Sequence, residues 1–247
     1  MMPSGLGYAQ TESQLTPKWV ETLSEDRVVG VALGYAFTLV VTNAGAVFSF
    51  GAGEAGLLGH GLLEPEVLPR RIEALAQTGR RFVAVAAGDH AFALTEGGHL
   101  YGWGGGDANG HGRDEPTPRQ VAAFVGERVK LVCTSVATSC AVTEKGELFT
   151  WGCSGLGQLG HGDGEQPLTP KQVEGLSEVK VAAAAMCDTH TLVANEDGVV
   201  WAFGNRLASG LGDSDAAPED EDFVGQPTPI ATLRVRARKS PAVLPFR

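Results

Sequence analysis

The stretch LFTWG at residues 148–152 recurs in four variants along the chain, and this recurrence decides the fold. The other three variants are VFSFG at 47–51, LYGWG at 100–104 and VWAFG at 200–204. Their closing glycines lie 53, 48 and 52 residues apart. Self-similarity at a period of about fifty residues is typical of repeat architectures, so the chain is predicted to repeat one structural unit four times.

Large and small side chains alternate within each variant. Positions two and four are aromatic: Phe48/Phe50, Tyr101/Trp103, Phe149/Trp151 and Trp201/Phe203. The residue between them is small: Ser49, Gly102, Thr150 or Ala202. Because successive side chains of a strand point to opposite faces, each variant is predicted to be a strand with one bulky and one small face. Bulky faces against small ones would let neighbouring sheets pack closely.

Each period holds three further segments that are typical of strands. A glycine-rich turn follows the variant, and then comes a segment led by proline, at Pro69, Pro118, Pro170 and Pro229. An apolar strand comes next, as in FVAVA at 82–86, and another strand ends in a turn, as in AFALT at 91–95. One four-stranded sheet cannot bury both its faces, and radial stacking of such sheets gives a β-propeller. The predicted fold class is therefore all-β, a β-propeller.

Two segments resemble a known repeat. LFTWG at 148–152, followed by GLGQLGHG at 155–162 and Thr169-Pro170, is similar to the signature of the regulator-of-chromosome-condensation repeat. AAGDHAFALT at 86–95 resembles the other half of that repeat. The resemblance implies a propeller, usually of seven blades. This chain holds four complete repeats and a leading half-repeat at 5–20, which leaves an open arc, a small ring or part of a seven-bladed ring.

The repeats also set the domain boundaries. The predicted blades are about 27–79, 80–127, 128–178 and 179–232. Thr16-Pro17 matches the outer strand of a blade, so residues 1–26 are predicted to carry the leading outer strand of an incomplete blade. The propeller then extends over 1–232, and residues 233–247 form a basic C-terminal tail.

Composition agrees with this architecture. Of 247 residues, 34 are glycine, 43% are hydrophobic and only 19% are charged, as expected for short strands joined by tight turns. No run approaches the roughly 18 apolar residues that cross a membrane. Residues 1–10 lack the basic start and apolar core of a signal peptide. We therefore expect a soluble, intracellular protein without a membrane span, in a compartment that the sequence does not name.

Charge is distributed unevenly along the chain. The net charge is −10, but residues 234–247 hold five basic residues and no acid, so the preceding body carries −15. A body this acidic repels a phosphate backbone. We therefore expect no direct nucleic acid binding.

The fourth blade departs from the repeat through a longer, charged connection. Gly212 to Pro229 spans 17 residues, where the equivalent Gly160 to Pro170 spans 10. The extra length carries Asp213, Asp215, Glu219, Asp220, Glu221 and Asp222, and the tail carries Arg234, Arg236, Arg238 and Lys239. We interpret both groups as candidate contacts for partners of opposite charge. A solvated loop without a partner and a weak calcium site are the alternatives for the acidic group.

Motifs that suggest chemistry have structural interpretations. GAGEAG at 51–56 satisfies the dinucleotide-binding fingerprint, but a turn follows it where that site needs a helix. One repeat position is occupied by His60, His111 and His161. These histidines are therefore predicted to lie on three separate blades. At His90 and His190 the resemblance implies a buried histidine that bonds to backbone.

The cysteines form no CxxC pair and no zinc-like spacing. They are Cys133, Cys140, Cys153 and Cys187. Three of them stand where other repeats carry alanine, threonine or glycine, which indicates small buried residues. We predict no metal, no cofactor and no catalytic residue in this chain.

These observations favour a non-catalytic protein-interaction scaffold, a subunit of a larger assembly whose partners are other proteins. The alternative is a guanine-nucleotide exchange factor for a small GTPase, an activity that the resemblance implies for the family. Exchange needs a wedge that pries the nucleotide loose, and the founding member of the family uses an inserted β-hairpin. No blade of this sequence shows such an insertion, so exchange is the less favoured hypothesis.

Overall fold

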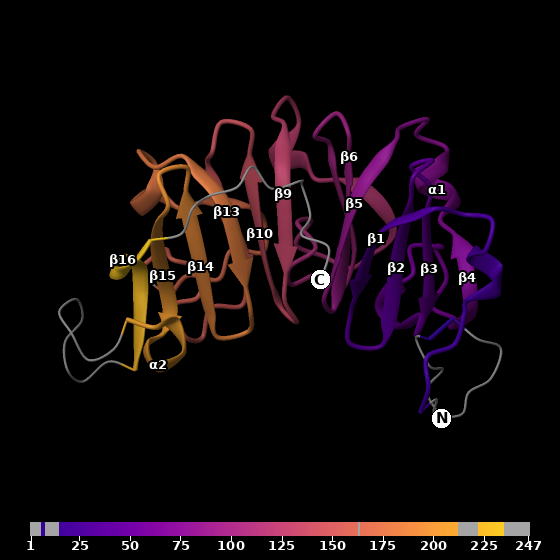
Figure 1. Ribbon diagram of the computed structural model, residues 1–247, viewed down its shortest axis with the longest axis horizontal. Helices are drawn as coiled ribbons and strands as arrows, with labels where there is room; N and C mark the ends of the chain where they lie inside the picture. The colour runs from indigo at the N-terminus through magenta and orange to yellow at the C-terminus, as the bar shows by residue number, and fades with distance from the viewer. Residues whose placement is uncertain (1–5, 8–14, 163, 212–221, 235–247) are drawn as a thin grey trace.

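The computed structural model describes residues 6–7, 15–162, 164–211 and 222–234, which form four antiparallel sheets of four strands (Figure 1). Strands neighbour one another in chain order within each sheet. The first sheet is β1 (Val28–Leu33), β2 (Phe37–Thr42), β3 (Val47–Gly51) and β4 (Glu66–Arg71); the second is β5 (Phe82–Ala87), β6 (His90–Thr95), β7 (Leu100–Gly104) and β8 (Glu115–Gln120); the third is β9 (Val129–Thr134), β10 (Thr138–Thr143), β11 (Leu148–Gly152) and β12 (Lys171–Gln172); the fourth is β13 (Val181–Met186), β14 (His190–Asn195), β15 (Val199–Asn205) and β16 (Phe223–Arg234). The all-β prediction is confirmed.

The third strand of every sheet lies where the aromatic repeat predicts it. β3, β7 and β11 begin at the predicted residues, and β15 begins one residue earlier, at Val199. Bulky and small side chains of these strands are both buried: Phe50, Trp103, Trp151 and Phe203 on one face, Ser49, Thr150 and Ala202 on the other. Each third strand is therefore covered on both faces, as the alternation of large and small residues predicts.

The core lies between blades more than within them. β5 packs on β1 and β2, β9 on β5 and β6, and β13 on β9 and β10. The indole Nε1 of Trp103 donates to the carbonyl of Leu57, in the preceding blade, at 2.9 Å. Trp151 repeats this contact with the carbonyl of Ala108 at 2.7 Å. Each of these tryptophans therefore fastens its own blade to the glycine-rich turn of the blade before it.

Short helical turns connect strands within a sheet or between neighbouring sheets. They are η1 (Glu21–Leu23), η2 (Glu54–Gly56), α1 (Glu73–Ala76), η3 (Ala122–Phe124), η4 (Glu174–Leu176) and α2 (Arg206–Ser209). Four of them, η1, α1, η3 and η4, precede the inner strand of a blade, and each buries one large side chain: Leu23, Leu75, Phe124 and Leu176. No helix among the described residues is long and apolar enough to cross a membrane.

The four sheets form an arc that does not close into a ring. The first and fourth sheets lie at opposite ends of the arc, with the two middle sheets between them (Figure 1). Of the three arrangements that the sequence left open, the described residues adopt the open arc, and a small closed ring is excluded for them. Each end sheet therefore has one side on which no further sheet of the described chain packs.

The predicted leading outer strand is not formed by the described part of residues 1–26. Residues 15–20 belong to no strand, and η1 follows them directly. In the third blade the equivalent residues, Lys171–Gln172, are a strand because they pair with β11. Residues 15–20 have no third strand of their own blade beside them among the described residues, and an isolated strand has no partner for its backbone hydrogen bonds.

Candidate interaction surfaces

The histidines at the shared repeat position fasten the glycine-rich turn to the third strand. His60 Nε2 lies 3.0 Å from the Ser49 hydroxyl, which donates in turn to the carbonyl of Leu58 at 2.7 Å. His161 Nε2 lies 3.0 Å from the hydroxyl of Thr150 in the same way. The hydroxyl already donates to a carbonyl, so the imidazole Nε2 donates to the hydroxyl oxygen. These histidines lie on separate blades, as predicted, and their role there is structural.

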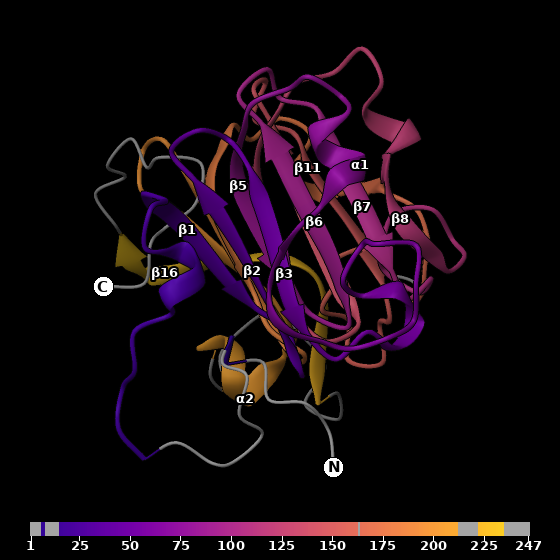
Figure 2. The ribbon, with the colours of Figure 1, turned by 90° about the vertical axis from the view of Figure 1, so that its right-hand side faces the viewer.

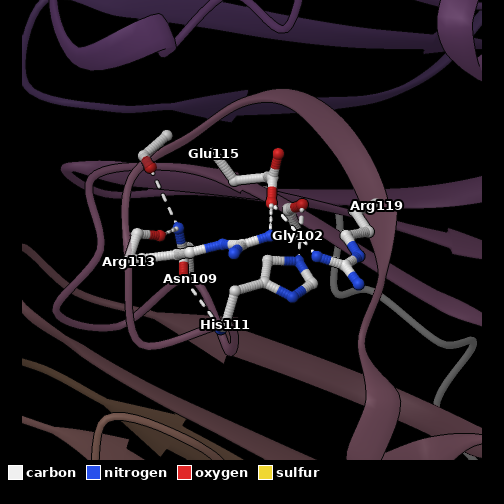
Figure 3. A network of polar contacts seen from close by, with 7 residues as sticks. Gly102, Asn109, His111, Arg113, Glu115 and Arg119 are labelled. Atoms are coloured by element: carbon white, nitrogen blue, oxygen red, sulfur yellow. Dashed lines mark hydrogen bonds and ion pairs between the residues drawn. The ribbon is translucent and has the colours of Figure 1, made fainter.

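The second blade replaces this arrangement with the network in Figure 3. Gly102 stands where the other blades carry Ser49 and Thr150, and His111 Nε2 lies 3.0 Å from its carbonyl oxygen. The Asn109 side chain donates to the carbonyls of Gly104 and Arg113 at 2.9 and 2.7 Å. A Cβ on Gly102 would lie 2.2 Å from the Asn109 carbonyl oxygen, so the shortened turn closes only over glycine.

Charged residues border this turn without forming a reactive site. Glu115 lies 3.4 Å from Arg113 and 3.6 Å from Arg119, and both arginines are exposed. Burial lowers the pKa of His111, and the hydrogen bond to Gly102 opposes that shift. The imidazole is therefore neutral near pH 7 and is held as part of the turn.

His90 joins the second blade to the third. It is 1% exposed, and its Nε2 lies 2.6 Å from the Ser139 hydroxyl and close to that of Thr134. Burial lowers its pKa to about 3, partly opposed by a backbone hydrogen bond to Val136. The structural role that the resemblance implied is confirmed. His190 is only half-buried, because no further described blade packs over it.

Two other motifs also have structural explanations. The GAGEAG stretch runs into η2, a single 3-10 turn, and a Cβ on Gly53 would lie 2.0 Å from the Glu64 carbonyl oxygen. All four cysteines are free thiols. Cys140 is fully buried opposite Cys133 on the neighbouring strand, whereas Cys133, Cys153 and Cys187 are half-buried. Only Cys140 therefore meets the expectation of full burial.

The charged residues that the sequence singled out lie mostly outside the described residues. That is so for Asp213, Asp215, Glu219, Asp220, Glu221, Arg236, Arg238 and Lys239. Asp222 is exposed, and its carbonyl accepts a hydrogen bond from the Arg206 amide at 3.0 Å. Arg234 is the last residue of β16 and is paired in register with Val199. Their role as partner contacts stays a prediction.

The sequence did not indicate an apolar face at the open end of the first blade. Val29, Val31 and Leu33 alternate along β1, and Tyr35 follows them in the next turn; they are 46%, 50%, 72% and 83% exposed. We call these four residues the end face. Figure 2 shows β1, β2 and β3 in front at this end. The equivalent strand β5 is largely buried because β1 and β2 pack on it.

The outer part of the same end is covered by the leading half-repeat. Val20 and Leu23 pack against Val40 and Phe50 of the first blade. Gly7, at φ 75°, lies so close that an added Cβ would be 3.0 Å from the Phe50 ring. Gly59 and Gly160 stand in the same relation to Trp103 and Phe203 of the next blades. The half-repeat therefore takes the place of a preceding blade's outer part and leaves the inner part, the end face, open.

The repeat profile named "Regulator of chromosome condensation (RCC1) repeat" matches residues 44–94 and 145–194. The chain belongs to the family of RCC1-repeat proteins. Each matched segment begins at the turn before a third strand and ends in the second strand of the next blade. The resemblance in the sequence is thereby confirmed.

Relatives of the chain share this repeat and this fold. It is 35% identical over 204 residues to the ultraviolet-B receptor UVR8 of Arabidopsis thaliana, which covers 81% of this chain and 46% of that protein. Human WBSCR16 superposes with a TM-score of 0.69 at 22% identity over 84% of this chain and 54% of its own. Prp20p of Saccharomyces cerevisiae superposes with a TM-score of 0.54 at 19% identity, over 93% of this chain and 72% of its own. The chain thus spans about half the length of UVR8 and of WBSCR16.

Proposed function

We propose that this protein is a non-catalytic protein-interaction scaffold and a subunit of a larger assembly. The observation that carries the proposal is the end face, where Val29, Val31 and Leu33 point into solvent at strand positions that are buried or half-buried in the second, third and fourth blades. Contiguous apolar surface of this kind marks a contact with another protein. The partner is a protein surface that packs on β1 as β1 packs on β5.

Burial of the end face would supply useful binding energy. Covering a Val, Leu or aromatic side chain contributes roughly 1.5–3 kcal/mol when it is fully removed from water. The end-face residues are about half to four-fifths exposed, so together they contribute on the order of 4–8 kcal/mol. Association costs about 4–15 kcal/mol in lost freedom, so the partner must contact further surface as well. Trp19, 74% exposed beside the same end, is available for this.

Related proteins support a role in binding other proteins. A solved structure of yeast RCC1 (Prp20) contains it bound to Kap60, and another study of Prp20p concerns its binding to Gsp1p and histones. Both share only the fold with this chain, at 19% identity. They show that propellers of this family present surfaces to other macromolecules, which is the coarse function proposed here.

The test replaces the centre of the end face with charge. In a Val31→Lys/Leu33→Lys variant, the tagged protein should lose its co-purifying partners when it is isolated natively from cells and quantified by mass spectrometry. A Leu63→Lys/Val125→Lys variant is the matched control, because these residues are 63% and 68% exposed and lie away from the end face. Circular dichroism checks that both variants fold.

Two results would count against the scaffold. If the same proteins co-purify with the end-face variant and with the control, the end face is not the binding surface. If the purified protein accelerates nucleotide release from a small GTPase in catalytic amounts, the exchange-factor alternative replaces the scaffold. We expect neither result.

A further inference from the structure

A hollow with a basic rim lies at the junction of the first two blades. Its volume is about 230 Å³, and its floor is built of buried apolar side chains: Val47, Ile72, Leu75 and Phe82. Arg71 and Arg80 line its rim. The hollow adjoins α1, which lies beside β4 at the end of the arc opposite to α2 in Figure 1. None of the four end-face residues lines the hollow, which lies on the side of the first blade that faces the second blade, so the hollow is separate from the end face.

The hollow exists because one connection is longer than its counterparts. Ile72 to Phe82 spans 10 residues, where Val20–Val28, Val121–Val129 and Val173–Val181 each span 8. The extra residues let α1 form a full α-helical turn, and Gly79 at φ 65° then reverses the chain with nothing within 4 Å of its Cβ position. Gly79 itself lines the hollow.

Both rim arginines are departures from the repeat. Arg71 stands where the second and third blades carry Gln120 and Gln172. Arg80 stands where the other connections carry Asp26, Glu127 and Val179. The repeat itself requires neither positive charge, and both departures occur at one hollow. Basic residues that the repeat does use, such as Arg81, are bonded within the fold: Arg81 donates to the carbonyl of Asn43 at 2.6 Å.

Within the described part of the chain, no carboxylate neutralises the rim charges. Among the described residues, no ion pair joins Arg71 or Arg80 to a carboxylate, whereas Arg81 lies 3.4 Å from Glu96. Arg80 instead lies 3.1 Å from Nδ1 of His99. Burial lowers the pKa of His99, and Arg80 and then Arg128 lower it further. The site is thus locally positive on a chain whose net charge is −10.

We propose that this hollow binds an acidic segment of a partner protein, with carboxylates on Arg71 and Arg80 and one apolar side chain on the floor. Guanidinium groups pair with carboxylates through two parallel hydrogen bonds, which gives orientation as well as affinity. The volume is below the roughly 300–1,000 Å³ of small-molecule pockets, so it suits a single side chain. The acidic body disfavours a nucleic acid here. The inference adds a partner chemistry to the scaffold and rests on that proposed function.

The experiment measures fluorescence anisotropy of a short labelled peptide rich in glutamate, with one central leucine. A twin peptide has glutamine in place of every glutamate. The variant is Arg71→Gln/Arg80→Gln, because glutamine already occupies the position of Arg71 in two other blades. Arg113→Gln/Arg119→Gln, in the exposed ion pairs of Figure 3, removes the same charge elsewhere and is the matched control.

We expect the wild type and the control to bind the glutamate peptide. The rim variant should bind it about tenfold more weakly, a difference of about 1.4 kcal/mol, because it loses the charge-assisted hydrogen bonds of both arginines. Binding should also weaken as salt is raised. Three results would overturn the proposal: the glutamine peptide binds as tightly as the glutamate peptide, the control variant loses as much affinity as the rim variant, or the protein binds only a single-stranded DNA probe. The Val31→Lys/Leu33→Lys variant should bind the peptide normally, so failure here and failure of the end face are separable.

Discussion

Truncation of Trp151 tests the inter-blade core most directly. The ring is completely buried. Its centroid lies 5.8 Å from that of the Phe92 ring of the second blade, which it meets edge-on, and 6.3 Å from that of Phe124. Removing a large aromatic side chain from a core costs about 3–5 kcal/mol. Trp151→Phe keeps a ring and loses one hydrogen bond to the Ala108 carbonyl, which still accepts from Ser139 at 2.9 Å. That variant should therefore cost only about 1 kcal/mol.

Urea unfolding followed by far-ultraviolet circular dichroism measures these costs without relying on tryptophan emission. With a denaturant slope of about 2–3 kcal/mol per molar, Trp151→Ala should lower the unfolding midpoint by about 1–2.5 M. Trp19→Ala is the control, because its ring is 74% exposed and should change stability by less than about 0.5 kcal/mol. Equal midpoints for Trp151→Ala and Trp19→Ala would refute burial of Trp151 between two blades.

Two further predictions concern close packing and protonation. Gly88→Ala places a Cβ 1.8 Å from the Ser135 carbonyl oxygen of the next blade and should cost about 1–3 kcal/mol, whereas Gly155→Ala enters open space and should be neutral in thermal melting. His90 has a folded pKa of about 3 against 6.5 unfolded, so the unfolded chain binds more protons between these values. The free energy of unfolding should be highest above pH 6.5 and should fall by up to about 1.4 kcal/mol per pH unit below it. Urea unfolding at a series of pH values measures this dependence, and a pH dependence that His90→Thr leaves unchanged would contradict the prediction.

The blades could be predicted from sequence because their signal is local and repeated. In VFSFG at 47–51, alternation of large and small residues specifies a strand and its two faces without knowledge of any partner. The glycine-rich turns carry the same kind of local signal, since Gly59 and Gly160 adopt φ values of 72° and 77° that favour glycine. Four copies of the pattern then predict four blades, and they leave open whether the blades form an arc or a ring.

The predictions that were wrong concern residues whose secondary structure or burial depends on what packs beside them. The Thr16-Pro17 segment has the sequence of an outer strand, but a strand forms only where another strand accepts its hydrogen bonds. His190 has the same sequence context as His90 and yet is half-buried, because burial of His90 is supplied by Ser139 and Thr134 of the following blade. The repeat pattern contains no information on which blade is the last one.

The interaction surfaces could have been found by comparing repeats with one another. Leu33 replaces Ala87 of the second blade, and Arg71 replaces Gln120, so both departures are visible in the printed sequence. The sequence did not show what these departures mean. Leu33 is exposed because the arc is open, and Arg71 borders a hollow because one connection is two residues longer than its counterparts. A departure from the repeat indicates a special position, and only the packing shows what that position is open to.

Both proposed surfaces involve the first blade, and the forces that act at them differ. The end face is apolar, so its contribution follows buried area and depends little on salt. The hollow is basic, so its contribution is to orientation and rate of encounter and weakens with ionic strength. A partner that uses both should associate more slowly at high salt while dissociating at a rate set mainly by Val31 and Leu33. Loss of the salt dependence in Arg71→Gln/Arg80→Gln, with dissociation unchanged, would show that the two surfaces act on one partner.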